Sequence, residues 1–179
     1  MIKIRRFGEA KQVSDLYHIT DIEGFIHIVE ENILEARNFT YISCTRDRLM
    51  TFYFGMKPSS FFKIQLDGEK LSNHFKIAPF NYKGAQSNIS FQEFEEIILT
   101  DRIPSIDKFI LKYIFIYENY EKFYKEDLSV EGYNLGSQGI IYKEDLKTYI
   151  LSVPEDLFYI QNRGKIQQID FDKFFDLYF

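Results

Sequence analysis

The stretch that most constrains this chain is residues 15–48, which read DLYHITDIEGFIHIVEENILEARNFTYISCTRDR. A short apolar run with His18 and Thr20 leads directly into a segment of helical periodicity. A second short run, with Ser43 and Thr45, follows it. Runs of this length and composition are typical of strands, so the stretch predicts a strand, a helix and a second strand that returns beside the first.

The predicted helix has a start signal and an apolar face. Residues 20–23, TDIE, fit the S/T-x-x-E capping box, in which the two polar side chains accept hydrogen bonds from free backbone N–H groups. Apolar residues then recur at the spacing of one helix face, at Ile22, Phe25, Ile26, Val29 and Ile33. We therefore expect an ordinary packing helix that begins at this cap.

Side-chain alternation along the two predicted strands suggests where a site lies. Side chains point to opposite faces in turn, so His18 and Thr20 share one face of the first strand. By the same alternation, Ser43 and Thr45 share one face of the second strand. We expect both faces to border a common space. A purely structural sheet has no use for an imidazole and several hydroxyl groups there, so this space is the best candidate for a functional site.

Length and composition fit one globular domain over residues 1–179. Apolar residues make up 45% of the chain and charged residues 27%, which is ordinary globular usage. The 22 Lys and Arg against 27 Asp and Glu give a net charge of −5, which opposes general binding to a phosphate backbone. Nucleic-acid contacts would be local, for example through the basic N-terminal arm or edge strand expected over residues 1–14.

The cysteine count and the apolar segments bear on location. The single cysteine, Cys44, excludes an intramolecular disulfide and a multi-cysteine zinc site. The opening residues MIKIRRFGEAKQ lack the apolar core of a signal peptide, and no stretch approaches the roughly 20 apolar residues of a membrane span. We expect a soluble cytoplasmic protein with no membrane partner.

The remainder of the chain predicts further strands and helices. Strands are expected at residues 61–66, from Ile97 within the acidic segment 91–99, at 109–117, and as a pair at 139–142 and 147–153. Helices are expected at residues 47–55, 69–73, 118–127 and 169–179, the last docking through aromatic residues at helical spacing. Residues 83–90, KGAQSNIS, are typical of a loop.

Three motifs, taken in order, resemble the signature of the ADP-ribosyltransferase superfamily. They are LYHIT at residues 16–20, YISCTRD at 41–47 and EFEEIIL at 93–99. Members carry a histidine or arginine on a first strand, a serine, threonine or tyrosine on a second, and a glutamate that opens a later strand. The resemblance covers residues 15–99 and is nearest to small phage or bacterial members, including toxins. It implies an α+β fold, a split β-sandwich with flanking helices.

The resemblance also implies roles in binding NAD. His18 would hydrogen-bond the ribose on the adenosine side, and the backbone at Ile19 and Thr20 would meet the nicotinamide amide. Many relatives have glycine in place of Ile19. Ser43 and Thr45 would support the nicotinamide ribose.

Further roles follow from the same resemblance for the segment after the second strand. Tyr53 or Phe52 would stack on the nicotinamide ring. Arg46 would neutralise the pyrophosphate or orient the acceptor, because a guanidinium offers paired donors to phosphate oxygens.

A glutamate is required because glycosidic cleavage passes through an oxocarbenium-like state that a carboxylate stabilises. Glu93, Glu95 and Glu96 all have suitable chemistry. Glu96 directly precedes the apolar strand, as the catalytic glutamate of the superfamily does, so we prefer it and place Glu95 second.

The expected activity is transfer of ADP-ribose from NAD to a macromolecule, as in a phage or toxin effector acting in a bacterial cytoplasm. Net acidity favours a protein acceptor over a nucleic acid. The alternative is a non-catalytic binding, virion-associated or inhibitor protein that retains the fold, which the Ile19 departure and the aromatic C-terminus favour.

Other chemistries have weaker support. A cysteine hydrolase would use Cys44 with His18 as base, but alternation places Cys44 opposite Ser43 and Thr45, and hence in the core. The three histidines lack the spacing of paired metal ligands, so no metal is expected. No G-x-G-x-x-G or P-loop motif is present.

Overall fold

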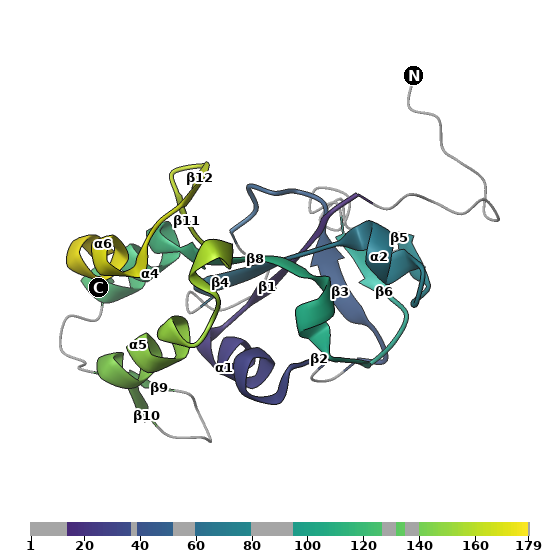
Figure 1. Ribbon diagram of the computed structural model, residues 1–179, viewed down its shortest axis with the longest axis horizontal. Helices are drawn as coiled ribbons and strands as arrows, with labels where there is room; N and C mark the ends of the chain where they lie inside the picture. Colours follow the sequence, from purple (N-terminus) through teal and green to yellow (C-terminus); the bar gives the residue numbers. More distant parts are fainter. Residues whose placement is uncertain are drawn as a thin grey trace.

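A large sheet organises the protein (Figure 1). The computed structural model describes residues 14–36, 39–51, 60–79, 95–126, 132–134 and 140–178. Eight of the described strands pair in the order β12-β11-β8-β4-β1-β3-β6-β5, and only β8 and β11 are parallel. Their bounds are β1 Leu16–Thr20, β3 Ile42–Thr45, β4 Phe62–Leu66, β5 Ile77–Pro79, β6 Glu95–Ile98, β8 Ile110–Ile116, β11 Phe158–Asn162 and β12 Lys165–Gln168.

Two small ribbons and several helices complete the described fold. One ribbon pairs β2 with β7 and the other pairs β9 with β10, with bounds β2 Ile33–Glu35, β7 Arg102–Pro104, β9 Gly132–Asn134 and β10 Ile140–Tyr142. The α-helices are α1 Ile22–Glu31, α2 Gly68–Ser72, α4 Tyr117–Glu126, α5 Lys143–Leu151 and α6 Phe171–Tyr178. The 3₁₀ turns are η1 Ile106–Phe109 and η3 Glu155–Leu157.

The mixed α and β class expected from the sequence is confirmed. The strands are mostly antiparallel, and in the part of the chain described here eight of them form one sheet, which does not show the split β-sandwich that the resemblance implies. One continuous sheet forms because β8 pairs with β4 on one side and with β11 on the other. Strand β8 is the long apolar run predicted as a central strand, and burial on both faces explains its lack of alternation.

Several elements differ from their predictions. Residues 147–153 were expected as a strand but belong mostly to α5, and β10 pairs with β9 instead. The expected helix at 47–55 is a turn over its described part, because the Met50 amide donates to the Asp47 carbonyl at 3.2 Å. The remainder of that prediction, and those for residues 1–13 and 83–90, lie outside the described residues.

Helix α1 begins one residue later than the capping box predicts. Thr20 still belongs to β1, and Asp21 is the N-cap, its carboxylate accepting from the Gly24 amide at 2.9 Å. Asp and Thr are both good N-caps, so the sequence offered two adjacent choices. The helix ends at Asn32, which adopts a left-handed conformation with φ of 54°, and Ile33 consequently starts β2 rather than extending the helix face.

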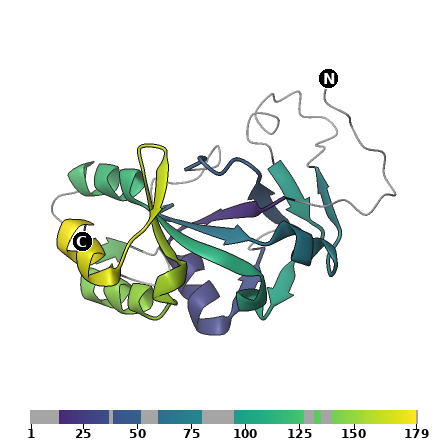
Figure 2. The same cartoon turned by 45° about the horizontal axis from the view of Figure 1, so that its top comes forward.

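One face of the sheet carries the hydrophobic core. Phe25 of α1 stacks on Phe62 of β4, with ring centroids 3.7 Å apart. Phe174 of α6 meets Phe115 and Phe158 edge-on at 5.1 and 5.0 Å, which confirms the predicted docking of the C-terminal helix. Helices α1 and α5 lie side by side along the sheet (Figure 2), and both bury apolar residues in the same cluster.

The opposite face of the sheet is buried but polar near its centre. The pairing of β4 with β1 and β8 places Lys63 and Gln65 on the face that Phe62 and Ile64 do not use. Lys63 is fully buried there, and so is Gln161 of β11. The two faces therefore differ in chemistry although both are closed to water.

Candidate functional site

Three neighbouring strands bring together segments far apart in the sequence. Strand β3 pairs with β1 on one side and with β6 on the other. Tyr17 is opposite Thr45, and Cys44 is opposite Glu96, so His18, Cys44 and Glu96 form one cross-strand row on one face. With strands about 4.8 Å apart, the Cα atoms at the two ends of this row are roughly 10 Å apart.

The same register places the hydroxyl residues relative to His18. Thr45 is opposite Tyr17, so Ser43 and Thr45 lie on the face of the sheet that His18 does not use, although both His18 and Ser43 line one cleft. Alternation fixes the faces within a strand, but the offset between two strands is not written in either one, and a shift of one residue exchanges the faces. The sequence predicts that the two strands are neighbours, but it does not predict their register.

His18 nevertheless contacts Ser43 through the backbone. The Nδ1 atom of His18 lies 2.9 Å from the Ser43 carbonyl oxygen. A carbonyl only accepts, so this bond assigns the proton to Nδ1, and Nε2 of the neutral ring is then an acceptor. The bond fixes the orientation of the imidazole at the junction of β1 and β3.

Arg46 and Glu96 form an ion pair at the opposite end of the row. The Arg46 Nη2 atom lies 2.7 Å from Glu96 Oε1, and the side chains are 38% and 9% exposed. A charge-assisted hydrogen bond of this length holds an ionised carboxylate in a position that is largely withdrawn from water. Arg46 and Glu96, to which the resemblance assigns roles in the reaction, are therefore in direct contact.

Thr45 has a local structural bond. It is fully buried, and its hydroxyl oxygen accepts from the Asp47 amide at 3.0 Å. Cys44 is also fully buried and belongs to the hydrophobic cluster. Its burial matches the sequence expectation, although it shares a face with His18. A thiol without exposed surface offers no route for a substrate to reach it.

A cleft of about 660 Å³ opens beside His18, between α1 and the start of β3. Ligand sites commonly have volumes of this order. Of the residues predicted to bind NAD, four line it, namely His18, Ile19, Thr20 and Ser43. The lining does not include Thr45, Arg46 or Glu96. Phe52 and Tyr53 lie outside the described residues, as does the side chain of Glu95.

The cleft combines apolar, aromatic and acidic surfaces. Phe39 is 63% exposed, and its ring lies 5.3 Å from that of Tyr41, which also lines the cleft. The acidic lining residues are Asp21, Glu23, Glu30 and Glu35, and none of the described residues that line the cleft is a lysine or an arginine. Glu35 is paired with Arg102 at 3.1 Å. A polyanion is poorly matched to this surface.

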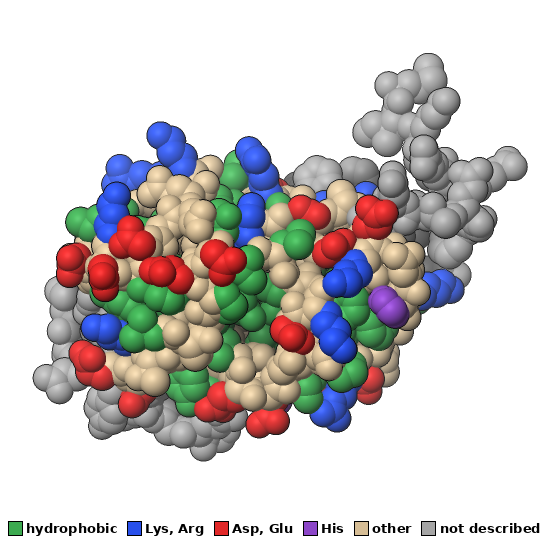
Figure 3. All heavy atoms as spheres, viewed as in Figure 1, with side chains coloured by type: hydrophobic (Ala, Val, Ile, Leu, Met, Phe, Trp, Pro, Cys, Tyr) green, Lys and Arg blue, Asp and Glu red, His purple; other side chains and the backbone are tan. Residues whose placement is uncertain are grey.

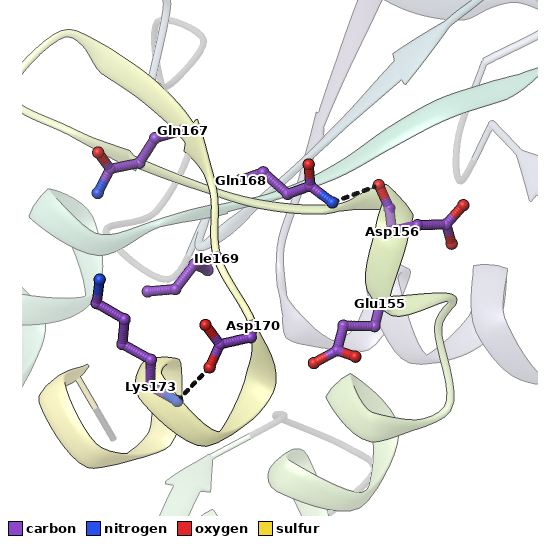
Figure 4. A pocket seen from close by; sticks show the side chains of 7 residues that line it. All are labelled: Glu155, Asp156, Gln167, Gln168, Ile169, Asp170 and Lys173. Carbon is purple, nitrogen blue, oxygen red and sulfur yellow. Dashed lines mark hydrogen bonds between the residues drawn. The ribbon is translucent and has the colours of Figure 1, made fainter.

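A second hollow of about 500 Å³ lies at the other end of the sheet, by the start of α6 (Figure 4). Its polar groups are used in local structure. Asp170 accepts from the Lys173 amide at 2.8 Å, Glu155 accepts from the Phe171 amide at 2.8 Å, and Gln168 donates to the Asp156 carbonyl at 3.2 Å. Acidic side chains gather over this end of the molecule (Figure 3). These bonds cap a helix and suggest no reaction.

Sequence reasoning missed the buried polar residues behind the site. Lys63 donates hydrogen bonds to the carbonyl oxygens of Arg48 and Met50, and the Gln161 amide donates to that of Leu49. The available signal was the alternation FFKIQL at residues 61–66, in which Lys63 and Gln65 occupy one face. That pattern is usually assigned to a solvent-facing surface, and only the tertiary structure shows it is covered.

Comparison with known proteins finds neither a family model nor a curated protein that matches this sequence. Among the described residues, no helix is both long and apolar enough to cross a membrane. Within those same ranges, no group of three or more histidine, cysteine, aspartate or glutamate side chains is placed to hold a metal ion.

Proposed function

We propose that the protein transfers ADP-ribose from NAD to a macromolecular acceptor, using the row from His18 to Glu96. The observation that carries the proposal is the adjacency of β1, β3 and β6, which places His18 and Glu96 on one face. The three motifs that resemble the ADP-ribosyltransferase signature supply these strands in chain order.

The cleft and the ion pair have complementary roles in this proposal. His18, with its proton on Nδ1, accepts from a ribose hydroxyl through Nε2, and the cleft beside it takes the rest of the adenosine part. Arg46 lies at the other end of the row and is still 38% exposed, so its guanidinium can meet the pyrophosphate. The acidic cleft itself is not suited to the phosphates.

Glu96 supplies the carboxylate that the reaction needs. The bond between C1′ of the nicotinamide ribose and the ring nitrogen breaks, and its electron pair leaves with nicotinamide. The carboxylate of Glu96 stabilises the positive charge that develops on the ribose. The acceptor then forms the new bond to C1′ and loses its proton to water.

The acceptor favoured by the charge distribution is a protein. The net charge of −5 and the acidic lining of the cleft both oppose a nucleic acid. A basic side chain of a protein meets no such repulsion.

The test is incubation with NAD labelled in its adenylate phosphate and a bacterial lysate, with nicotinamide release measured in parallel. We expect Glu96→Gln to lower both label transfer and nicotinamide release by about a hundredfold or more, because the stabilising charge is lost. The matched control is Glu155→Gln, since Glu155 begins η3 at the other end of the sheet and accepts a bond from the Phe171 amide that glutamine can also accept. This control should retain activity within about twofold.

Other outcomes decide between the alternatives. Activity that survives Glu96→Gln but disappears in Glu95→Gln would assign the reaction to the other carboxylate. Hydrolysis of a test ester that disappears in Cys44→Ala, in a variant shown to be folded, would favour the cysteine hydrolase. Wild-type protein that neither binds NAD nor releases nicotinamide would instead favour the non-catalytic binding protein.

A further inference from the structure

Lys63 is the most deeply buried charged side chain among the described residues. Its ammonium group donates to the carbonyl oxygen of Arg48 at 2.6 Å and to that of Met50 at 2.9 Å. A third bond goes to Oε1 of Gln161. An ammonium group has three N–H donors, so each is used once. Burying a charge is costly unless it is satisfied in this way, so the three bonds offset the cost of burying the ammonium group here.

The bonds from Lys63 belong to a larger set on one short segment. Four successive carbonyl groups, those of residues 48–51, each accept a hydrogen bond from a side chain of the sheet or of α4. Lys63 donates to the carbonyl groups of residues 48 and 50. Gln161 donates to that of residue 49 at 2.9 Å, and Asn119 donates to that of residue 51 at 2.8 Å. Asn119 also donates to the Ser60 carbonyl at 2.8 Å. Side-chain hydrogen bonds therefore fix the backbone of this segment at each of its four residues.

The amide groups of the same segment are bonded as well. The Asp47 amide donates to the Thr45 hydroxyl oxygen at 3.0 Å, and the Leu49 amide donates to the Asp47 carboxylate at 2.9 Å. The Met50 amide closes the turn on the Asp47 carbonyl at 3.2 Å. Residues 47–50 thus form a hydrogen-bonded turn after β3. This turn begins directly after Arg46.

We propose that Lys63 is a positioning residue for the site, which holds the turn 47–50 so that Arg46 stays paired with Glu96. This inference rests on the proposed function. Thr45 and Arg46 leave β3 toward opposite faces, Thr45 toward the face of Lys63 and Arg46 toward Glu96. Fixing the backbone on both sides of Arg46 limits the positions its guanidinium can take. Without Lys63, three acceptors lose their donor together.

The groups around Lys63 determine the pH at which it stops fixing the turn 47–50. Burial lowers the pKa of Lys63 to about 8, and the carboxylates of Asp47 and Glu118 oppose that shift. The Tyr17 ring lies 5.5 Å from the ammonium group, and burial raises the pKa of its phenol. Arg48 in the turn adds a positive charge near this phenol. A neutral amine has two N–H donors, so it cannot serve three acceptors, and the turn should loosen as pH rises through about 8.

The first test compares Lys63→Met with the wild-type protein by amide hydrogen exchange. We expect exchange of the Leu49 and Met50 amides to increase about tenfold or more, while amides of β4 and β8 keep their protection. The matched control is Lys70→Met, because Lys70 also donates from its ammonium group to a carbonyl, that of Lys108 at 2.7 Å, but at an exposed position. Unchanged exchange of the two turn amides in Lys63→Met would overturn the proposal.

A second measurement needs no substitution, so it stands even if Lys63→Met does not fold. Between pH 7 and 9.5, the protection of the Leu49 and Met50 amides in wild-type protein should fall relative to that of β4 amides. Protection of the two amides that stays parallel to β4 over this range would contradict the role of the charged ammonium group. Neither exchange measurement depends on NAD.

Kinetics separate positioning from general stability. In the transfer assay, Lys63→Met should lower kcat/KM about tenfold, with a lower kcat and a higher KM, since a misplaced Arg46 affects both the position of Glu96 and the contact with the pyrophosphate. Added to Glu96→Gln, it should lower activity no further, because both act through one pair. Additive losses would overturn the positioning role. The wild-type protein could show no NAD turnover while Lys63→Met shows faster exchange in the turn. That combination would overturn the proposed function alone, and Lys63 would remain the residue that holds the turn.

Discussion

On one face of the sheet, Phe62 and Phe115 pack ring against ring beneath α1 and α6, whereas on the other face Lys63 and Gln161 are buried in a polar network. Both faces exclude water, but they respond differently to change. Apolar contacts are numerous and non-directional, so the aromatic face provides stability with some tolerance of shape. The polar face depends on a few directional bonds, so it fixes the backbone at one place, beside the candidate site.

The largest expected effect lies on the aromatic face. Phe62→Ala removes a fully buried ring that stacks on Phe25 at 3.7 Å, and we expect a loss of about 3–5 kcal/mol in the free energy of unfolding. Phe39→Ala is the matched control, because Phe39 is 63% exposed and its loss should cost about 0.5 kcal/mol or less. Urea unfolding measures both. Similar losses in the two variants would show that burial of the ring does not govern its contribution to stability.

The second prediction is that Lys63 on the polar face makes the free energy of unfolding depend on pH. In the unfolded chain Lys63 keeps its proton up to about pH 10.5, whereas burial lowers its pKa to about 8 in the folded protein. Between these values the unfolded chain binds more protons, so stability rises with pH, by about 2–3 kcal/mol between pH 8 and 10 from this group. Lys63→Met should lack this rise, while its matched control Lys70→Met keeps it. Urea unfolding at several pH values measures the difference.

The pH range ends near 10 because tyrosines then act in the opposite direction. Burial raises the pKa of Tyr113 to about 12, so above pH 10 the folded protein holds a proton that the unfolded chain releases, and stability falls. A rise between pH 8 and 10 that persists in Lys63→Met would assign the effect to some other group.

The aromatic face was the more readable of the two from sequence. The runs around Phe62, Phe115 and Phe174 predicted two strands and the C-terminal helix, because long apolar or periodic segments depend little on their surroundings. Residues 147–153 were misread as a strand, since the helical signal of α5 is weak without the partners that bury Leu146 and Ile150. Strand β2 was missed because Ile33 has the spacing of the helix face. The helix nevertheless ends one residue earlier, at Asn32.

The candidate site was only partly readable. The motifs identified the strands that carry His18 and Glu96, and the structure makes these strands near neighbours. It also pairs Arg46 with Glu96, a contact between residues 50 positions apart that no local pattern encodes. Register between strands and burial of Lys63 both arise from tertiary pairing, so they lie beyond what alternation within one strand can predict.

A third prediction compares two arginine–glutamate pairs that differ mainly in burial. Glu96 is 9% exposed beside Arg46, whereas Glu35 is 39% exposed beside Arg102. Glu96→Gln should lower the free energy of unfolding by about 1–3 kcal/mol, because it leaves a guanidinium without its ionised partner. Glu35→Gln should cost less than about 1 kcal/mol. Urea unfolding at pH 7 tests both, and addition of salt should weaken the second effect more than the first. Equal losses would mean that burial does not determine how much each ion pair contributes to the free energy of unfolding.

The smallest expected effect tests what holds α5 against α1 on the aromatic side. The Tyr149 hydroxyl donates to Glu30 at 2.7 Å, and this bond raises the pKa of the phenol. The bond is exposed, so Tyr149→Phe should lower the free energy of unfolding by only about 0.5 kcal/mol. Ile150→Ala on the same helix removes a fully buried side chain and should cost about 2–4 kcal/mol, which makes it the matched comparison. A larger loss in Tyr149→Phe than in Ile150→Ala would mean that a polar bond, rather than burial, docks this helix, and would remove the contrast between the two faces of the sheet.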